Sequence, residues 1–401
     1  MIQLASYNSC TGCGACAFVC NKTAISLNAN DIGVIVPSID VDKCVECGRC
    51  QKVCPAIEAP KFHAPRHAYA AWHNSTKERV SSASGAIASA AYHFALDNGW
   101  DIAGAAQNDD FSVDVVVSDK VEDISLFKNS KYVFSSITKL LPRLAENIRN
   151  NKKTLVIALP CQIAAIRKAF PNQESLILSD VVCHGTTPLS YLTQHIHTIE
   201  DKEKKKAKRM SFRDPAFNTY TFTFSLYDDS GDCFYAKRTK DGDTYQYAYH
   251  RIVSYRENCF HCQYARPERV GDFTLCDYSG LGKHYPFDYN RINCSCILVN
   301  TEVGENYIKL LVENNIITAF ERPLEEPVSG NRQLRQPCNK SKARLDFEKL
   351  IEINNGDFEK AIHQVIGKQK RRKPIDKLIS FPAKLRSFSK KKYNQIKKKL
   401  S

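Results

Sequence analysis

Apolar and polar positions divide the chain into segments with different periodicity. Between residues 67 and 182, short apolar runs alternate with stretches of helical character. The predicted strands are His67–His73, Trp100–Ala106, Val113–Val117, Thr154–Leu159 and Leu176–Val182. The predicted helices between them are the alanine-rich Gly85–Leu96, then Ser136–Asn150 and Cys161–Phe170. This alternation predicts an α/β layer that contains parallel strands.

After residue 200 the pattern changes. Residues 201–209 are rich in lysine and are expected to form a loop. From Phe212 to Lys237, aromatic and polar residues alternate, which predicts an antiparallel hairpin. Further along, Tyr245–Val253 and Thr301–Glu313 are predicted helices, and Ile292–Val299 is a predicted strand.

The first 54 residues contain eight cysteines in two runs of the same spacing, C-x2-C-x2-C-x3-C. This is the spacing of bacterial two-cluster ferredoxins, in which the fourth cysteine of each run binds the other cluster. One 4Fe–4S cluster is therefore assigned to Cys10, Cys13, Cys16 and Cys54, and the other to Cys44, Cys47, Cys50 and Cys20. Two short strands, Ala24–Leu27 and Gly33–Val36, are predicted between the runs. The alternatives are zinc sites or disulfides, but zinc takes four ligands and leaves one cysteine of each triplet surplus.

Composition narrows the class of protein. A chain of 401 residues with 43% hydrophobic residues can form two or three domains with substantial cores. No apolar stretch reaches the roughly 18 residues needed to span a bilayer. The first residues lack the basic and apolar regions of a signal peptide. Together with 17 cysteines in ferredoxin-like spacing, this predicts a reducing cytoplasmic location.

The positive charge is concentrated at the end of the chain. Fourteen Lys or Arg residues and one acid lie between Lys368 and Ser401, so this tail carries +13 of the net +14. The body has no basic excess, which argues against a nucleic-acid partner. On one side of a helix after Pro382 would lie Leu385, Phe388, Tyr393, Ile396 and Leu400. This pattern is typical of a peripheral helix on an anionic membrane, and the alternative is a solvated, disordered tail.

Four further cysteines lie at the ends of predicted elements. Cys161 opens a helix after a buried strand, Cys183 ends the next strand, and Cys259 and Cys262 form a C-x2-C pair. Ends of parallel strands meet at one edge of a sheet, so these four cysteines are candidates for a third 4Fe–4S cluster. The alternative is two structural cysteines and a zinc half-site. The remaining cysteines are expected to be mostly structural thiols: Cys233, Cys276, Cys294, Cys296 and Cys338.

Two polar segments are candidates for phosphate binding. Ser82, Ser84 and Gly85 precede the alanine-rich helix, whose N-terminus favours an anion. Ser130, Lys131 and Tyr132 combine a hydroxyl, a cation and an aromatic ring that could hold a pyrophosphate and stack on a ring. The alternatives are an ordinary helix cap and a surface turn.

The order of these motifs resembles one family. Ser-Ala-Ser-Gly, Ser-Lys-Tyr, Pro-Cys-Gln, Cys-His-Gly, Ser211–Asp214, C-x2-C and Asp272–Gly280 follow one another as in the beta subunit of coenzyme F420 hydrogenase and dehydrogenase. The similarity covers about residues 66–300. It implies an FAD-binding domain with its own 4Fe–4S cluster at Cys161, Cys183, Cys259 and Cys262, and FAD at the two polar segments. Ala86, Leu159 and Cys276 depart from the family pattern, which leaves the details of the flavin pocket open.

The expected architecture is therefore a bacterial-type two-cluster ferredoxin domain (residues 1–57), an α/β flavin-binding domain in two parts (66–200 and 201–366) and a basic tail (367–401). Clusters carry single electrons and a flavin can also exchange two, so electrons from a redox partner protein or ferredoxin would reach an organic substrate. Bacterial relatives are often associated with surface-polysaccharide biosynthesis, so the resemblance implies a sugar or polyisoprenoid-linked substrate, whereas archaeal relatives use coenzyme F420. The alternatives are a non-catalytic iron–sulfur carrier and a structural zinc protein. No catalytic acid or base is assigned, and His184 is interpreted as a neighbour of Cys183.

Overall fold

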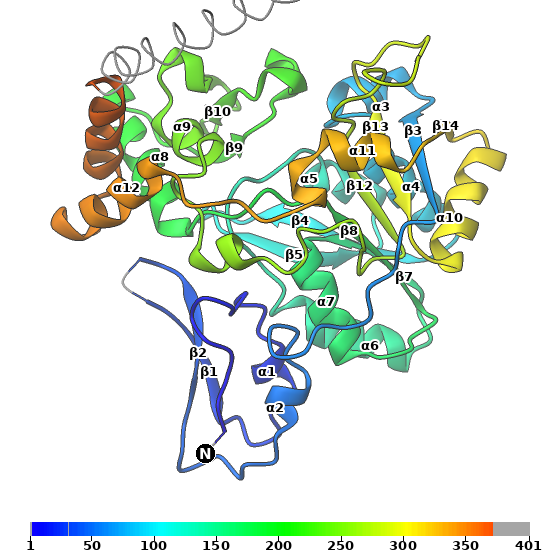
Figure 1. Ribbon diagram of the computed structural model, residues 1–401, viewed down its shortest axis with the longest axis horizontal. Helices are drawn as coiled ribbons and strands as arrows, with labels where there is room; N and C mark the ends of the chain where they lie inside the picture. The colour runs from blue at the N-terminus through cyan, green and yellow to red at the C-terminus, as the bar shows by residue number, and fades with distance from the viewer. Residues whose placement is uncertain (1, 31, 372–401) are drawn as a thin grey trace, which may run out of the picture. The chain divides into compact units, whose positions relative to one another are not determined.

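The computed structural model of the chain describes residues 2–30 and 32–371 (Figure 1). The chain divides into two compact units, Met1–Asn339 and Lys340–Ser401. All candidate site residues belong to the first unit. The amphipathic helix predicted after Pro382 lies outside the described residues, so the membrane prediction stays a prediction.

The N-terminal module is built from two similar halves. Its elements are α1 (Ala15–Phe18), β1 (Ile25–Ala29), β2 (Ile35–Ile39) and α2 (Arg49–Lys52), drawn in blue in Figure 1. The strands pair antiparallel, with Leu27 opposite Pro37. Each short helix follows a glycine in the left-handed region, Gly14 with φ 76° and Gly48 with φ 72°. Each of these glycines lies between the second and third cysteines of a run, where a residue with a Cβ would be strained.

One large sheet organises the rest of the first unit. Within the described residues it has nine strands. In spatial order they are β14 (Ile317–Arg322), β3 (His67–His73), β13 (Ser295–Val299), β12 (Phe273–Asp277), β8 (Leu176–Val181), β7 (Thr154–Ala158), β4 (Asp101–Gln107), β5 (Val113–Ser118) and β6 (Ser135–Ser136). The strands β12, β8, β7 and β4 are parallel neighbours, whereas β13 and β3 pair antiparallel. The predicted mixed α/β layer is therefore present.

Helices and a small second sheet surround the large one. Besides α1 and α2, the α-helices described in the first unit are α3 (Thr76–Ser81), α4 (Ile87–Asp97), α5 (Ile124–Phe127), α6 (Leu140–Arg149), α7 (Pro160–Ala169), α8 (Leu189–Glu203), α9 (Thr244–His250), α10 (Glu302–Glu313) and α11 (Glu325–Gly330). The small antiparallel sheet contains β9 (Arg209–Ser211), β10 (Phe224–Tyr227) and β11 (Cys233–Lys237). The second unit contains α12 (Lys342–Ile353) and a helix over residues 358–371.

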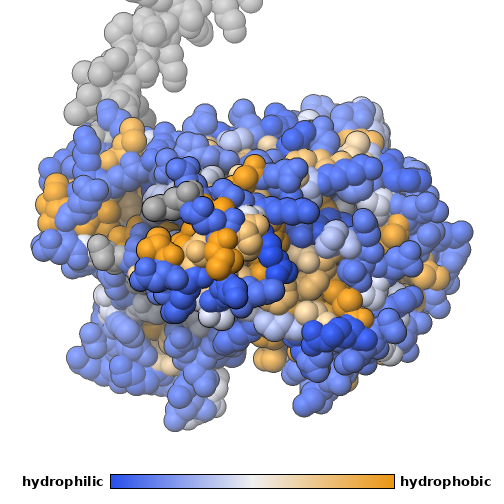
Figure 2. Space-filling view, turned by 90° about the horizontal axis from the view of Figure 1, so that it is seen from below, coloured by the Kyte–Doolittle hydropathy of each residue, from blue (hydrophilic) through white to orange (hydrophobic). Residues whose placement is uncertain are grey.

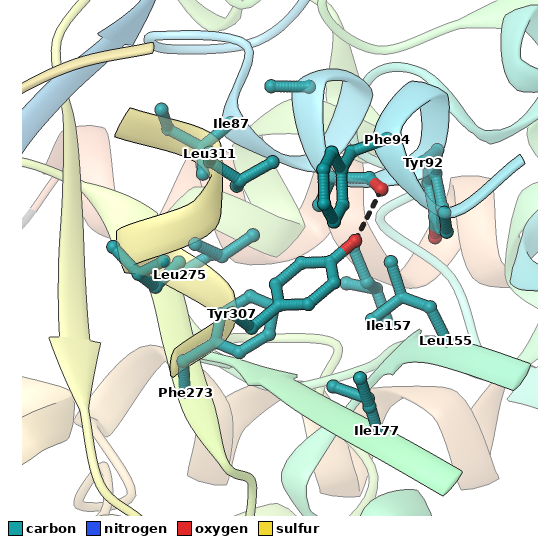
Figure 3. Packing of buried hydrophobic residues seen from close by; sticks show 14 of the residues in the cluster. Ile87, Tyr92, Phe94, Leu155, Ile157, Ile177, Phe273, Leu275, Tyr307 and Leu311 are labelled. Atoms are coloured by element: carbon teal, nitrogen blue, oxygen red, sulfur yellow. Dashed lines mark hydrogen bonds between the residues drawn. The ribbon is translucent and has the colours of Figure 1, made fainter. Parts of the chain in front are cut away.

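Alternating residues of the central strands supply two hydrophobic cores. On β7, Leu155 and Ile157 face the core under α4 and α10, while Val156 and Ala158 face the core under α6 and α7. In the first core, the Tyr307 hydroxyl donates to the Ala91 carbonyl at 2.6 Å, and its ring stacks on Phe273 (Figure 3). The second core includes Ala15 and Val53, so it is continuous with the N-terminal module. The sheet therefore holds the cluster module against α6 and α7.

Most predicted elements are confirmed to within a few residues, and the differences have local causes. The helix predicted from Ser136 begins at Leu140, because residues 135–136 pair with β5 as β6. The hairpin predicted from Phe212 is formed only by β10 and β11, since residues 215–221 form two short 3-10 turns around Asn218. The loop predicted over 201–209 begins later, because α8 continues to Glu203.

No helix among residues 2–30 and 32–371 is long and apolar enough to cross a membrane. In the face shown in Figure 2, hydrophobic groups are interspersed among predominantly hydrophilic residues.

Candidate iron–sulfur and cofactor site

The N-terminal cysteines gather in two groups. Cys54, from the second run, lies close enough to Cys10, Cys13 and Cys16 to raise the pKa of their thiols. Burial is the larger cause, and it raises the pKa of Cys13 to about 11. Thiolates are the form that binds iron, and burying them together is unfavourable unless a cationic centre is present. This crossed grouping is the one predicted from the spacing for the first cluster.

The second group is formed by cysteines near α2. Cys44 and Cys47 act electrostatically on Cys50, whose pKa is raised chiefly by burial. Cys20, the predicted fourth ligand, accepts a hydrogen bond from the Ala24 N–H at 3.4 Å. An N–H donor of this kind stabilises a thiolate. The individual ligand assignments remain predictions.

A third set of cysteines lines one cavity of about 140 Å³ in the body. Cys161 lies in the first turn of α7, directly after β7, and Cys183 follows the adjacent parallel strand β8. Cys259 and Cys262 come from the turn around Glu257–His261. The parallel pairing of β7 and β8 thus brings together residues that are far apart in the sequence. The structure places all four predicted cysteines around the same space.

The electrostatics of this cavity are those of a site that needs positive charge. Burial is the main cause that raises the pKa of Cys161 and Cys183 well above the usual value, and the neighbouring thiols raise it further. The pKa of Cys262 is raised to about 11 in the same way. An N–H donor from Thr186 points at the Cys259 sulfur at 3.4 Å. Four thiolates could coexist here only with a cationic group between them.

The arrangement also bears on which metal group would fit. In residues 2–30 and 32–371, no three His, Cys, Asp or Glu side chains are placed to share one metal ion. A cubane binds each thiolate through a different iron, so its four ligands stand farther apart than those of one zinc ion. A set of four cysteines can bind a 4Fe–4S cluster and can also bind zinc, so the third cluster stays a prediction.

A buried ion pair fixes the loop that carries Cys259 and Cys262. Arg269 donates from Nη2 to Asp180 Oδ1 at 2.6 Å and from Nε to the same oxygen at 3.1 Å. Its Nη1 donates to the carbonyl of Tyr264, two residues after Cys262. Asp180 belongs to β8, which leads to Cys183. The pair thus ties two parts of the four-cysteine site together.

The N-terminal module contacts the wall of this site. Arg256 donates from Nη1 to the Thr11 carbonyl at 2.9 Å, and Gln263 donates to the Pro55 carbonyl at 2.6 Å. Cys13, a predicted ligand of the first cluster, lines the same cavity as the four body cysteines. The first ferredoxin cluster and the body site are therefore neighbours.

A second and larger cavity, of about 500 Å³, adjoins the first. It lies within the range of volumes that bind small molecules and cofactors. Both predicted phosphate-binding segments contribute to its wall, with Ser82 and Ser84 from one and Ser130, Lys131 and Tyr132 from the other. Residues Leu159, Gln162 and 183–186 line both cavities.

Gly85 is placed differently from the prediction. It is not among the lining residues of the large cavity. A Cβ added there would meet the Ala71 carbonyl oxygen at 2.4 Å and the Ser295 nitrogen at 2.7 Å. Its N–H donates to Ser295 Oγ at 2.8 Å. Gly85 therefore lets the segment pack onto β3 and β13, and the space that it preserves is not that of a phosphate.

The large cavity contains polar groups that lack a partner within the described residues. Buried atoms without a hydrogen bond include Ser82 Oγ, Asn129 Oδ1 and Arg213 Nη2, and all three residues line the cavity. An unpaired buried donor or acceptor costs about 1–3 kcal/mol. Such groups are expected where a polar ligand completes the hydrogen bonding, so the residues present fit a polar cofactor.

Charged and aromatic groups also converge on the cavity. The Lys131 ammonium donates to the Leu126 and Lys128 carbonyls at 2.6 and 3.0 Å, and burial lowers its pKa to about 7. The Tyr132 ring stacks on Tyr249 with centroids 4.4 Å apart. Arg213 Nη1 donates to both carboxylate oxygens of Asp277, at 2.9 and 3.0 Å. A cation, stacked rings and an oriented guanidinium suit a ligand with an anionic part and a flat ring.

Several of these residues were not predicted as functional. From the sequence, Arg213 and Asp277 were recognised only as members of motifs. Their pairing joins positions 64 residues apart. The Asp180–Arg269 pair was not identified, since charges separated by a long segment give no periodic signal. His184 lies at both cavities, and burial lowers its pKa.

Comparisons with known proteins agree with this arrangement. Residues 151–323 match the family described as the C terminus of the beta subunit of coenzyme F420 hydrogenase/dehydrogenase. Residues 9–57 and 36–94 each match a 4Fe-4S dicluster domain.

Two curated proteins and one solved structure are similar over long segments. One subunit of the F(420)H(2) dehydrogenase of Methanosarcina mazei is 21% identical over 353 residues, which is 84% of this chain and 92% of that protein. The coenzyme F420-dependent sulfite reductase of Methanocaldococcus jannaschii is 26% identical over 163 residues, 40% of this chain and 25% of the reductase. A chain of the F420-reducing NiFe hydrogenase complex from Methanosarcina barkeri superposes with a TM-score of 0.43 at 18% identity, covering 80% of this chain and 96% of that one.

Proposed function

Because the chain belongs to the coenzyme F420 hydrogenase/dehydrogenase beta-subunit family and carries a 4Fe–4S dicluster domain, we propose that it is an iron–sulfur flavoprotein oxidoreductase. Its two curated relatives are named as a dehydrogenase subunit and a reductase, which supports a redox role. The finer part of the proposal is that FAD binds in the large cavity.

The observation that carries the proposal is the shared wall between the two cavities. Cys183 and its neighbours through Thr186 line both the four-cysteine site and the large cavity. Cys13, a predicted ligand of the first ferredoxin cluster, also lines the four-cysteine site. These contacts form a continuous series from the N-terminal clusters to the cavity. FAD bound there would exchange single electrons with a cluster and two electrons with an organic substrate.

The chain's own residues would bind and orient the cofactor. Ser82 and Asn129 would complete their hydrogen bonds on the anionic part, near the Lys131 ammonium. Tyr132, held by its stack on Tyr249, offers a face to the ring system. Arg213, which lines the cavity, is oriented by Asp277, and its Nη2 has no hydrogen-bond partner among the described residues, so it would donate to the cofactor. The half-buried and buried walls would limit the access of water.

The electron donor in this proposal is a redox partner protein, as expected for a subunit of a larger assembly. The substrate is a small organic molecule. A sugar or polyisoprenoid-linked compound remains the prediction from the family resemblance. The second candidate is an iron–sulfur carrier without flavin, and it is favoured only if the large cavity does not bind FAD.

Cavity size provides a test of the flavin site. Ala88, on the first turns of α4, is half-buried and lines the cavity. Ala88→Leu should fill part of this space and remove most of the FAD, while iron content stays unchanged. Ala88→Ser, which adds little volume at the same position, is the matched control and should retain FAD. Full flavin occupancy in a folded Ala88→Leu protein would show that FAD does not bind here, and absence of flavin from the unmodified chain would favour the carrier.

A further inference from the structure

Three cysteines outside the predicted clusters lie on or beside two neighbouring strands. Cys276 lies in β12, Cys296 lies in β13, and Cys294 directly precedes β13. In the antiparallel register of these strands, Cys276 is directly opposite Cys296. Directly opposed residues of such a pair share one face of the sheet, with Cα atoms about 4.5–5.5 Å apart. This separation lies within the range of about 4.4–6.8 Å that a disulfide requires.

Side-chain contact singles out Cys296 as the partner of Cys276. The two thiols are close enough to hydrogen bond to one another. Both side chains belong to the cluster that contains Ala68 and Leu298. Cys294 packs in another cluster, with Ala70 and Leu281, although it is only two residues away. The register of the two strands therefore places Cys296, and not the nearby Cys294, opposite Cys276.

The two thiols differ in access. Cys276 is half-buried and lines the large cavity. Cys296 is completely buried behind it, and burial raises its pKa well above the usual value. A small molecule in the cavity can therefore reach Cys276 and not Cys296. One accessible thiol backed by one enclosed thiol is the arrangement in which the first attacks a disulfide and the second resolves the mixed product.

We propose that Cys276 and Cys296 form a reversible dithiol–disulfide pair that exchanges two electrons with a small disulfide compound entering the large cavity. The Cys276 thiolate attacks one sulfur of the compound, which forms a mixed disulfide, breaks the external S–S bond and releases one thiolate. Cys296 then loses its proton and attacks the Cys276 sulfur, which forms the Cys276–Cys296 bond and releases the second thiolate. The pair loses two electrons and two protons, and the compound gains both as two thiols. The reverse sequence reduces the pair.

Thiol–disulfide exchange needs no other redox group, so the inference does not rest on the proposed flavin; the disulfide compound enters the large cavity in chains that hold no FAD there. It assigns a role to Cys276, a position that departs from the family pattern. It also places a two-electron centre in the wall of a cavity that adjoins the cysteine site.

The test uses the full chain, purified anaerobically and equilibrated in buffers of reduced and oxidised glutathione over a wide range of ratios. Acid stops the exchange by protonating thiolates, and free thiols are then alkylated before digestion and mass spectrometry. Cleavage after Arg269, Lys283 and Arg291 places Cys276 on the peptide 270–283 and Cys294 with Cys296 on the peptide that starts at 292. Fragmentation of the linked pair identifies the bonded cysteine. The expected result is a Cys276–Cys296 link, with both thiols disappearing at one midpoint.

Single variants make the outcome specific. Cys296→Ser should abolish the linked peptide and leave Cys276 as a mixed disulfide with glutathione. Cys294→Ser, two residues before Cys296, is the matched control and should keep the link at the same midpoint. A link at background in the unmodified chain at every ratio, or a link from Cys276 to Cys294, would overturn the proposal. Iron and FAD are measured on the same sample before acid is added, so a missing flavin and a missing disulfide are scored separately.

Discussion

Replacement of Asp180 by asparagine should destabilise the body of the protein and loosen the four-cysteine site. The Asp180 side chain is 0% exposed and its partner Arg269 is 1% exposed. One carboxylate oxygen accepts from the guanidinium at 2.6 Å, and the other accepts from the Gly271 N–H at 2.8 Å. The amide has nearly the same shape, but it leaves the guanidinium as a buried charge without a counterion.

The expected magnitude follows from this burial. Removing one partner of a buried ion pair costs about 3–5 kcal/mol. For the unit Met1–Asn339 the entropy of unfolding is about 0.7 kcal/mol/K, so each kcal/mol lowers the melting temperature by about 1.4 °C and a decrease of roughly 4–7 °C is expected. The loop after Cys262 is bonded to the same guanidinium through the Tyr264 carbonyl. Loss of about four iron atoms, one cubane, should therefore accompany the destabilisation.

Tryptophan fluorescence follows this unit selectively. The chain has two tryptophans, and both lie on the large sheet or next to it, Trp72 in β3 and Trp100 before β4. The matched control is Glu146→Gln, which breaks a pair with Arg143 of 2.7 Å at sites 47% and 52% exposed. Exposed pairs contribute about 0–1 kcal/mol. If Asp180→Asn shifts the melting temperature no more than Glu146→Gln does, the Asp180–Arg269 ion pair does not stabilise this unit as proposed.

Three further outcomes are expected. The double variant Cys259→Ser, Cys262→Ser should lose about four iron atoms on elemental analysis and keep the electron paramagnetic resonance signal of the two N-terminal clusters. Unchanged iron content would exclude these residues as ligands. Burial lowers the pKa of Lys131 to about 7, so its charged form, which favours a bound phosphate, is lost as pH rises through that value. The affinity for FAD, titrated by fluorescence, should therefore fall from pH 6 to pH 9, and the Lys131→Met variant should bind FAD weakly at every pH. An affinity that still depends on pH in Lys131→Met would assign the titration to another group. Gly85→Val should lower the melting temperature whether or not flavin is present, because the new side chain meets the backbone of β3 and β13; a fully stable variant without FAD would instead support a phosphate site at Gly85.

The sequence was most informative where chemistry depends on local spacing. The two cysteine runs predicted the ferredoxin module and the position of Cys54 beside the first run, because cubane ligation fixes short intervals. The strand His67–His73 was predicted with its observed bounds, since a buried strand between polar boundaries gives a clear signal. The joining of Cys161 and Cys183 followed from a general property of parallel strands.

The remainder depends on contacts between distant segments. The strand β14 was not predicted, and it completes the sheet only by pairing with β3, with Ala319 opposite Ala71. The packing of Gly85 against β3 and β13 was not predicted, because a glycine before a helix looks the same in the sequence whether a phosphate or a strand approaches it. The opposed thiols of Cys276 and Cys296 depend on the register of β12 and β13, which no local pattern specifies.

The cofactors proposed for the two adjoining cavities and the N-terminal module are the central claim. The direct measurement is the content of iron, acid-labile sulfide, zinc and FAD in the full chain purified without oxygen. The account predicts about 12 iron and 12 sulfide atoms, as three cubanes, with one FAD per chain and no zinc. About eight iron atoms without flavin, or zinc in place of the third cluster, would contradict it.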